Sequence, residues 1–192
     1  IYTPPEGETL IRYLLKNLEV FIHSENGLDD LVRLAVMHYQ FEAIHPFPDG
    51  NGRTGRILNI LFLVDKGLLD TPILYLSRYI IANKNQYYKN LRAVTEKQDW
   101  EGWILYMLKG VEETAIYTLQ KINAINSLMQ ETISLAKEKL PSRVYSKELI
   151  ELLFEQPFCK VRFLVDRDIA KRQTAAEYLQ ELEKIGVLKS KK

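Results

Sequence analysis

The sequence predicts an all-α fold, and two observations support this prediction. Apolar residues recur three and four positions apart along most of the chain, which is the period of a helix with one buried face. Glycine and proline fall between these stretches, where helices would end. With 192 residues, of which 46% are hydrophobic and 27% charged, the chain is long enough for one large or two small domains with a real core.

The composition is that of an ordinary globular protein. The 26 Lys and Arg nearly balance the 25 Asp and Glu, although residues 160–192 carry nine basic against five acidic side chains. A solvated surface explains this mild imbalance as well as a nucleic-acid patch does. The single cysteine, Cys159, has no partner for an intrachain disulfide. No apolar run approaches the roughly 20 residues of a membrane span and no leader opens the chain, so we expect a cytoplasmic protein without membrane contact.

Two helices are predicted before the central motif. Residues 1–5 read as strand or coil, because β-prone residues precede two prolines. An apolar stripe of helical period then predicts a helix from Thr9 to about Ser24, and a second helix from Leu28 or Asp29 to Ile44 leads into the motif. The chain starts at Ile1 without methionine, and we expect it to be a fragment of a longer protein.

The residues from His45 to Arg56 form a loop between two helices, the second of which is predicted to begin near Arg53. Backbone N–H groups at a helix N-terminus lack intrahelical partners, so the glycine-rich turn could wrap an anion. Arg53 and Arg56 lie three apart in the first turn, where the helix dipole disfavours cations, and a bound polyanion would resolve this conflict. The alternative is a loop that only connects two helices, in which the histidine and arginines cap helix ends and form ion pairs.

The pattern His-x-Phe-x-Asp-Gly-Asn-Gly-Arg-x-x-Arg resembles the signature of the Fic family, with every specified position filled. The resemblance implies a helical bundle with the active-site loop between two core helices. It also implies transfer of AMP from ATP to a Ser, Thr or Tyr hydroxyl of a target protein. The implied roles are general base for His45, Mg²⁺ ligand for Asp49, and core anchor for Phe47. The implied phosphate contacts are Gly50, Asn51, Gly52, Arg53 for the β-phosphate and Arg56 for the γ-phosphate.

Further contacts follow from the same resemblance. Tyr87 or Tyr88 is a candidate for the adenine contact, although a core tyrosine fits as well. Thr95 stands where many relatives carry an asparagine, which puts adenine specificity in question. Residues 1–5 resemble the end of the β-hairpin flap that pairs with the target, and a frayed terminus is the alternative.

Many Fic proteins carry an inhibitory helix with the pattern Ser/Thr-x-x-x-Glu-Gly/Asn, and this chain has no full match. Residues 127–131 have the spacing, but Thr132 follows in place of Gly or Asn, so the match reads as coincidence. We expect any inhibitory segment upstream of Ile1 or on a partner, and we expect this chain to bind ATP and to modify itself.

After the motif the sequence predicts three more helices and then a second domain. Ser77 begins a short helix, residues 84–96 form another, and Asp99 caps a long helix that runs towards Leu140. Pro141 ends it, which divides the chain into a catalytic domain of residues 1–140 and a second domain of residues 141–192.

The second domain resembles a winged helix-turn-helix. Helices are predicted from Ser146 to Phe154 and from Lys171 or Arg172 to Ile185, with a short element between them and a β-entry at Val187. The wing itself would lie beyond Lys192. The recognition helix of the second domain would begin with three candidate DNA contacts, Arg172, Gln173 and Thr174. Many winged helices bind protein instead.

Three rival functions stay open. Two of them share the fold: a kinase that binds the nucleotide in the inverted orientation, and a phosphocholine transferase. From another class, the rival is a DNA-binding regulator that uses the motif as a nucleotide sensor. The expected partners are ATP with Mg²⁺ and a target-protein hydroxyl, with DNA and a second copy of the chain as further candidates.

Overall fold

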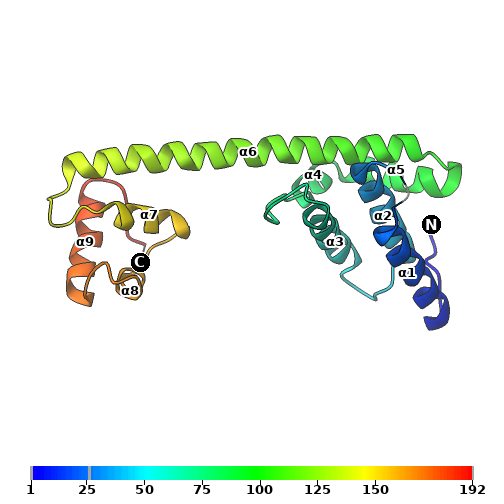
Figure 1. Cartoon of the computed structure of the whole chain (residues 1–192), viewed down its shortest axis with the longest axis horizontal. Helices are drawn as coiled ribbons and strands as arrows, with labels where there is room; N and C mark the ends of the chain where they lie inside the picture. Colours follow the sequence, from blue (N-terminus) through cyan, green and yellow to red (C-terminus); the bar gives the residue numbers. More distant parts are fainter. Residues whose placement is uncertain (1, 26, 192) are drawn as a thin grey trace. The chain divides into compact units, whose positions relative to one another are not determined.

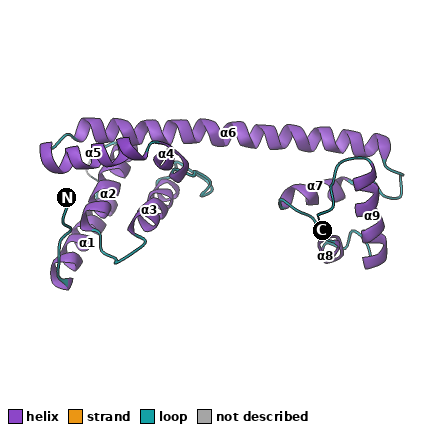
Figure 2. Cartoon of the chain, turned by 180° about the vertical axis from the view of Figure 1, so that it is seen from behind, coloured by secondary structure: helices purple, strands orange, loops and turns teal. Residues whose placement is uncertain are grey.

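The computed structural model describes residues 2–25 and 27–191, and every regular element in these ranges is a helix (Figures 1 and 2). The prediction of an all-α fold is therefore confirmed. Ile1, Asn26 and Lys192 lie outside the described residues. The chain divides into two compact units, Ile1–Leu119 and Gln120–Lys192, and each is described by itself.

The first unit opens with the two predicted helices. After an irregular segment, α1 runs from Glu8–His23 and packs on α2, Asp30–Ile44. Asp29 caps α2 through its side chain, which accepts a hydrogen bond from the N–H of Leu31 at 2.8 Å. Arg33 of α2 ties the two helices together, because its guanidinium donates to the carbonyls of Ile22 and Ser24.

Helix α3 spans Asn51–Asp65 and packs closely on α2. It begins two residues before the predicted start, because Gly50 adopts a left-handed conformation at φ 87° and turns the chain directly into the helix. The N-terminus of α3 therefore lies within the glycine-rich turn itself.

Three further helices complete the first unit. They are α4, Ser77–Ala82; α5, Lys84–Lys97; and the first part of α6, Trp100–Lys139. Asp99 caps α6 as predicted, accepting from the N–H of Gly102 at 3.0 Å. Trp103 is fully buried, and its indole N–H donates to the carbonyl of Ala35 at 2.8 Å, which fixes α6 against α2. Side chains at the centre of this core include Leu34, Met37, Phe41, Ile44, Leu76, Trp103 and Met107.

The second unit combines the last turns of α6 with α7, Lys147–Glu155; α8, Val161–Asp166; and α9, Arg172–Lys184. Ser146 caps α7 as predicted, and its hydroxyl accepts from the N–H of Leu149 at 3.1 Å. The core of this unit is apolar and consists of Ala136, Leu140, Val144, Leu149, Ile150, Leu152, Leu164, Ala175 and Leu182.

The division between the units falls inside α6, at Gln120, whereas the sequence analysis set the domain boundary at residue 140. Pro141 does end the helix, but Ile133, Ala136 and Leu140 pack into the core of the second unit. A helix end and a boundary between cores are separate features here, because one helix contributes to both cores.

The predicted β-entry at Val187 is wrong. Residues 187–191 form no strand, and several of their backbone N–H groups donate to the end of α9 instead. The N–H of Leu188 donates to the carbonyl of Leu182, and the N–H of Ser190 donates to the Glu183 carboxylate at 3.0 Å. At the other end, residues 2–6 are irregular, which fits the coil alternative of the sequence analysis. Among the described residues, no helix is both long enough and apolar enough to cross a bilayer.

Candidate functional site

The motif loop runs from His45 to Gly50 and joins α2 to α3. His45 is the residue that turns the chain out of α2, in the left-handed conformation at φ 48°, and its N–H donates to the carbonyl of Phe41 at 3.1 Å. This conformation is uncommon for a residue with a side chain. The imidazole is exposed to solvent, so it is accessible to a substrate.

Asn51 locks the loop from within. The residue is 2% exposed, and its amide makes two hydrogen bonds with the backbone of Phe47: the oxygen accepts from the N–H at 2.9 Å, and the nitrogen donates to the carbonyl at 2.5 Å. The side chain of Asn51 therefore serves the loop, and its backbone N–H is the group that faces the predicted anion site.

Phe47 does not point into the core as the sequence analysis predicted. Its side chain is 46% exposed and lies against Phe41, with ring centroids 6.4 Å apart. The double hydrogen bond from Asn51, rather than burial of an aromatic ring, is what anchors the loop.

The first turn of α3 offers unpaired donors. No side chain of the described residues caps this helix, and the nearest side-chain groups to Gly50 and Gly52 are the guanidinium groups of Arg53 and Arg56. The first N–H groups of a helix have no intrahelical acceptor and lie at the positive end of the helix dipole. This end of α3 is therefore suited to bind an anion.

The two predicted arginines take different positions. Arg53 is exposed and pairs with Asp49 at 3.1 Å, with both side chains mostly in solvent, so the pair contributes at most about 1 kcal/mol. Arg56 is half-buried and folds back over Gly52. A Cβ atom added at Gly52 would lie 3.0 Å from Nη1 of Arg56. Both guanidinium groups therefore stay on the same side of α3 as the loop glycines, and an anion could displace Asp49 from Arg53.

A cavity of about 420 Å³ opens beside His45. Tyr88, which is 57% exposed, forms part of its wall, whereas Tyr87 is 5% exposed and reaches it only from the core. Tyr88 is therefore the more accessible of the two candidate base contacts. The lining comprises Tyr2, Thr3, Glu42, Ala43, His45, Tyr87, Tyr88, Leu91, Arg92, Thr95 and Glu96.

The irregular N-terminal segment closes one edge of this cavity. The hydroxyl of Tyr2 donates to the carbonyl of Ala43 at 2.6 Å, and Thr3 also lines the cavity. The hydroxyl of Thr95, another lining residue, lies 3.0 Å from the hydroxyl of Tyr39. Thr95, where many relatives carry an asparagine, thus borders the cavity, and its hydroxyl is already in a hydrogen bond.

A buried polar chain stands behind the cavity, and the sequence analysis did not find it. His38 is fully buried; its Nε2 lies 3.0 Å from the hydroxyl of Tyr87, and its Nδ1 lies 3.1 Å from the amide nitrogen of Asn59. Burial, with a smaller effect of the charge on Arg56, lowers the pKa of His38 to about 4. The imidazole is therefore neutral at physiological pH. Its hydrogen bond with the Tyr87 hydroxyl fixes the position of Tyr87.

A second cavity, of about 280 Å³, borders the same helix turn. It is lined by Glu42, Gly52, Arg56, Ile80, Ile81, Lys84, Tyr87 and Tyr88. Glu42, Tyr87 and Tyr88 line both cavities. The sequence analysis also missed Glu42, although a carboxylate three residues before His45 was visible in the sequence.

The structure offers one carboxylate of the motif for a metal ion. Among residues 2–25 and 27–191, no cluster of three or more His, Cys, Asp or Glu side chains could hold a metal. Asp49 is 92% exposed at the start of the loop turn, with only Arg53 as an ion-pair partner. A single accessible carboxylate fits Mg²⁺, which commonly takes one or two protein carboxylates together with phosphate oxygens and water.

The remaining predicted contacts belong to the second unit. Arg172 and Gln173 are exposed at the first turn of α9, and Thr174 beside them is half-buried. The segment from Ser127 to Glu131 lies within α6, where the hydroxyl of Thr132 donates to the carbonyl of Leu128.

Two family profiles match the chain. Residues 1–63 match the Fic/DOC family, and residues 128–192 match the C-terminal domain of protein adenylyltransferases of the SoFic-like type. The matches cover the motif loop of the first unit and almost all of the second unit. The chain therefore combines a match to a Fic/DOC family domain with a match to a SoFic-like C-terminal domain.

Similar proteins carry adenylyltransferase names. The chain is 37% identical over 81 residues to a probable protein adenylyltransferase of Aquifex aeolicus, which covers 42% of the chain and 25% of that protein. It is 31% identical over 113 residues to the protein adenylyltransferase fic-1 of Caenorhabditis elegans, covering 58% of the chain and 21% of that protein. A protein adenylyltransferase Fic of Aedes aegypti is 29% identical over 142 residues, 73% of the chain and 26% of that protein. The chain thus spans about a quarter of the length of these relatives.

Proposed function

We propose that this chain is the catalytic part of a protein adenylyltransferase, which moves AMP from ATP to a Ser, Thr or Tyr hydroxyl of a target protein and releases pyrophosphate. One observation carries the proposal: an accessible histidine ends α2 beside an uncapped helix N-terminus that bears two arginines. The names of the similar proteins support it.

His45 acts as the general base. Imidazole titrates near neutrality and is the usual side chain for this role. A ring nitrogen of His45 takes the proton of the target hydroxyl while the hydroxyl oxygen attacks the α-phosphorus. The bond between the α-phosphorus and the oxygen bridging to the β-phosphate breaks, and pyrophosphate leaves. The exposed position of His45 at the cavity rim allows a protein substrate to reach it.

The start of α3 receives the triphosphate. The N–H groups of Gly50, Asn51 and Gly52 donate to phosphate oxygens, and the positive end of the helix dipole adds to the attraction. Arg53 exchanges its ion pair with Asp49 for the β-phosphate, and Arg56 binds the γ-phosphate. The positive charges stabilise the negative charge that develops on the leaving pyrophosphate.

Asp49 would hold Mg²⁺ together with phosphate oxygens and water, and the ion would neutralise phosphate charge when bound. Release of Arg53 towards the phosphate frees the Asp49 carboxylate for this role.

The larger cavity takes the nucleoside. Its volume of about 420 Å³ lies in the range of small-molecule sites, and its wall combines aromatic, aliphatic and polar groups. Tyr88 offers the accessible ring for the base, and Tyr87 supports it from the core with ring centroids 5.3 Å apart.

Label transfer tests this function against its rivals in the same fold. Incubation of the chain with a target lysate and ATP labelled at the α- or the γ-phosphate distinguishes two reactions. Adenylyl transfer puts only the α-label on protein, whereas a kinase transfers only the γ-label. Labelling from neither, with label from a phosphocholine donor instead, would identify a phosphocholine transferase.

Further partners belong to the same proposal. We expect a cytoplasmic location and keep a second copy of the chain as a candidate partner. DNA is a candidate for the second unit, because Arg172 and Gln173 are exposed at the start of α9. Salt-dependent binding of a duplex that is lost in an Arg172→Ala/Gln173→Ala variant would support this role.

A further inference from the structure

Glu42 lies in the last turn of α2 and lines both cavities of the site. Its Oε1 atom is buried and has no hydrogen-bond partner. A buried carboxylate oxygen without a partner costs stability, so its presence calls for a group that compensates it. No step of the proposed reaction uses this side chain.

The glycines of α3 identify the neighbour of this carboxylate. A Cβ added at Gly52 would lie 3.0 Å from Arg56 Nη1 and 3.7 Å from Glu42 Oε1. A Cβ added at Gly55 would lie 2.9 Å from the same oxygen. The carboxylate and the guanidinium therefore lie near the same face of α3, beside Gly52, without a direct ion pair between them among the described residues.

The electrostatics agree with this geometry. Burial raises the pKa of Glu42, and the charges on Arg56 and His45 oppose this effect. Arg56 is thus the stronger of the two cations that favour the ionised carboxylate. The attraction acts on both partners, so it also favours a position of the guanidinium close to the carboxylate.

We propose that Glu42 is a positioning residue, which holds Arg56 over Gly52 so that its guanidinium meets the terminal phosphates of the nucleotide. The inference rests on the proposed function, in which Arg56 binds the γ-phosphate. The guanidinium has five donors in a fixed plane, so one edge can lie against Glu42 while another faces phosphate. Prior orientation reduces the entropy lost when the nucleotide binds.

Nucleotide affinity tests the proposal. Calorimetric titration of the whole chain with ATP and with AMP compares wild type, Glu42→Gln, Arg56→Gln and the double variant. We expect Glu42→Gln to weaken ATP binding about tenfold and to leave AMP binding within about twofold, because AMP does not reach Arg56. In the Arg56→Gln background the same change should have no further effect on ATP, which is the signature of two coupled residues.

Glu101→Gln is the matched control, because Glu101 is an exposed glutamate on α6 that lines neither cavity. It should leave both affinities unchanged. Should Glu42→Gln fail to fold by circular dichroism, Glu42→Asp keeps the charge and carries the same comparison, with a smaller loss of ATP affinity.

Three outcomes would overturn the inference. Unchanged or tighter ATP binding by Glu42→Gln would mean that the carboxylate is idle or competes with phosphate. Equal weakening of ATP binding and AMP binding by Glu42→Gln would mean that Glu42 has a general structural role. Additive effects of the two substitutions in the double variant would mean that Glu42 does not act through Arg56. Failure of wild type to bind ATP would overturn the proposed function as well, and only this result affects both.

Discussion

The two units of the chain bury different kinds of side chain. The core of the first unit encloses Arg33, His38, Asn51, Asn59 and Asn90 together with its apolar residues. In the described part of the second unit, Thr132 is the one buried polar residue, and it bonds within its own helix.

Buried polar groups cost stability unless they are paired, so they persist where they hold something in place. In the first unit they do so: Arg33 ties α1 to α2, Asn51 locks the motif loop, and His38 fixes Tyr87 behind the cavity. In the second unit the polar contacts between elements lie at the surface, as in the ion pair of Arg167 with Glu155 and the hydrogen bond from the Tyr178 hydroxyl to the carbonyl of Arg143. The contrast agrees with the placement of the candidate site in the first unit.

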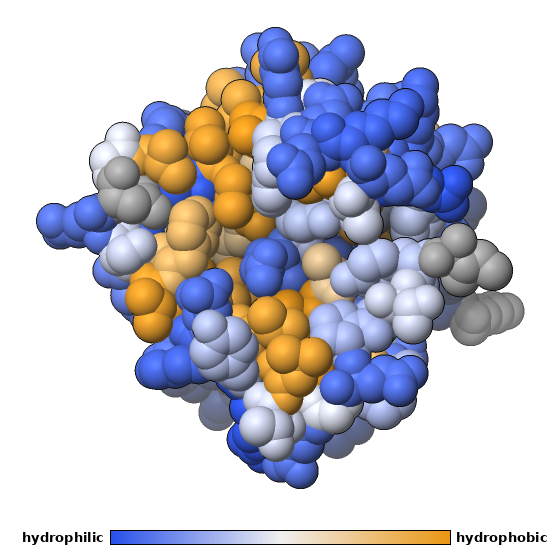
Figure 3. All heavy atoms as spheres, turned by 90° about the vertical axis from the view of Figure 1, so that its right-hand side faces the viewer, coloured by the Kyte–Doolittle hydropathy of each residue, from blue (hydrophilic) through white to orange (hydrophobic). Residues whose placement is uncertain are grey.

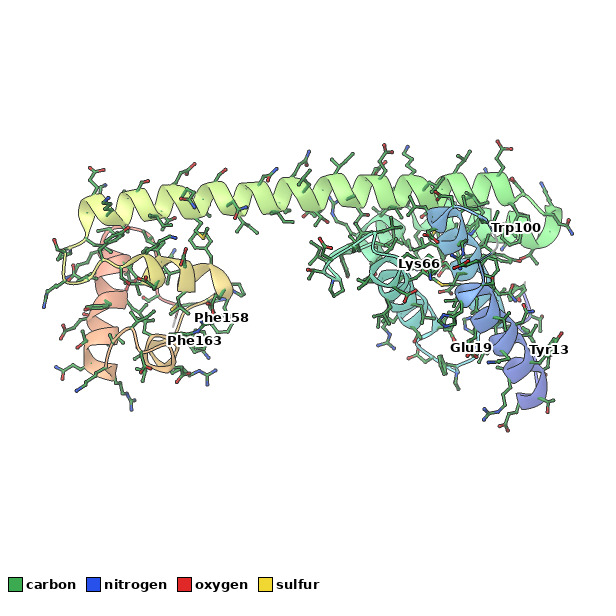
Figure 4. The ribbon with its side chains drawn as sticks, in the orientation of Figure 1. Tyr13, Glu19, Lys66, Trp100, Phe158 and Phe163 are labelled. Atoms are coloured by element: carbon green, nitrogen blue, oxygen red, sulfur yellow. The ribbon has the colours of Figure 1, made fainter. Side chains whose placement is uncertain are left out.

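Exposed apolar side chains occur on both units. Figure 3 shows hydrophobic residues among hydrophilic ones on one face, and several exposed apolar side chains lie on α1, among them Tyr13. In the second unit Phe158 and Phe163 lie side by side near the surface (Figure 4), with ring centroids 5.8 Å apart. Isolated apolar surface of this kind is normal and does not by itself mark a site.

The largest expected effect falls on the apolar core. Leu182 is fully buried in α9, and Leu182→Ala should lower the free energy of unfolding of the second unit by about 3 kcal/mol, through lost burial and the resulting cavity. Urea denaturation monitored by hydrogen exchange measures the loss of stability of the second unit. Val165→Ala, at a residue that is 37% exposed on α8, is the control and should cost much less. A parallel loss of ATP binding in Leu182→Ala would contradict the separation of the units.

A comparable effect should appear in the first unit on acidification. The pKa of His38 is about 4 in the folded protein, against 6.5 as its ordinary value, so the unfolded chain takes up the proton first. Stability is therefore fully present above pH 6.5 and falls as the pH drops towards 4, by up to about 3 kcal/mol. Urea unfolding at a series of pH values measures the slope. His38→Gln should reduce it, whereas His23→Gln, at an exposed residue, should not; an unchanged slope in His38→Gln would refute this account.

A smaller effect is expected at the contact between α2 and α3. In Gly55→Ala the new methyl group would lie 2.9 Å from Glu42 Oε1 and 3.1 Å from Phe41 Cδ1. Overpacking should outweigh the gain of about 1 kcal/mol that alanine brings to a helix interior, leaving a net loss of about 1 kcal/mol. Thermal denaturation measures the change, and a variant more stable than wild type would show that the two helices separate freely.

The smallest effect concerns the edge of the cavity. Tyr2→Phe removes the hydrogen bond to the carbonyl of Ala43, which is exposed and contributes about 1 kcal/mol or less. We expect faster proteolysis of the N-terminal segment and a loss of nucleotide affinity of about threefold or less. Tyr13→Phe, at a residue that is 68% exposed on α1, serves as control. Equal effects of the two substitutions would mean that the hydrogen bond of Tyr2 does not contribute to nucleotide binding at the cavity.

Much of this arrangement follows from the sequence. The helices follow from the apolar period, and the caps at Asp99 and Ser146 follow from residue type. The motif follows from the concentration of glycine, arginine and histidine in residues 45–56. These are local signals, and a sequence displays local signals directly.

Contacts between distant residues could not be predicted. His38 meets Tyr87 and Asn59 only after three helices pack, so nothing around His38 in the sequence distinguishes it from a surface histidine. Phe47 is predicted to point into the core and anchor the loop, but Asn51 anchors the loop instead and the Phe47 ring stays partly in solvent. The expected strand at Val187 failed for a related reason, since a strand requires a pairing partner as well as apolar residues.

The central claim is that His45 catalyses transfer of AMP at this site, and intact mass spectrometry tests it most directly. Wild type, His45→Ala and His23→Ala are incubated with ATP and Mg²⁺, alone and with candidate target proteins. The account predicts a gain of one AMP on the chain or the target with wild type and His23→Ala, and a loss of at least about a hundredfold in rate with His45→Ala. An equal gain with His45→Ala, or none with wild type while ATP is bound, would contradict it.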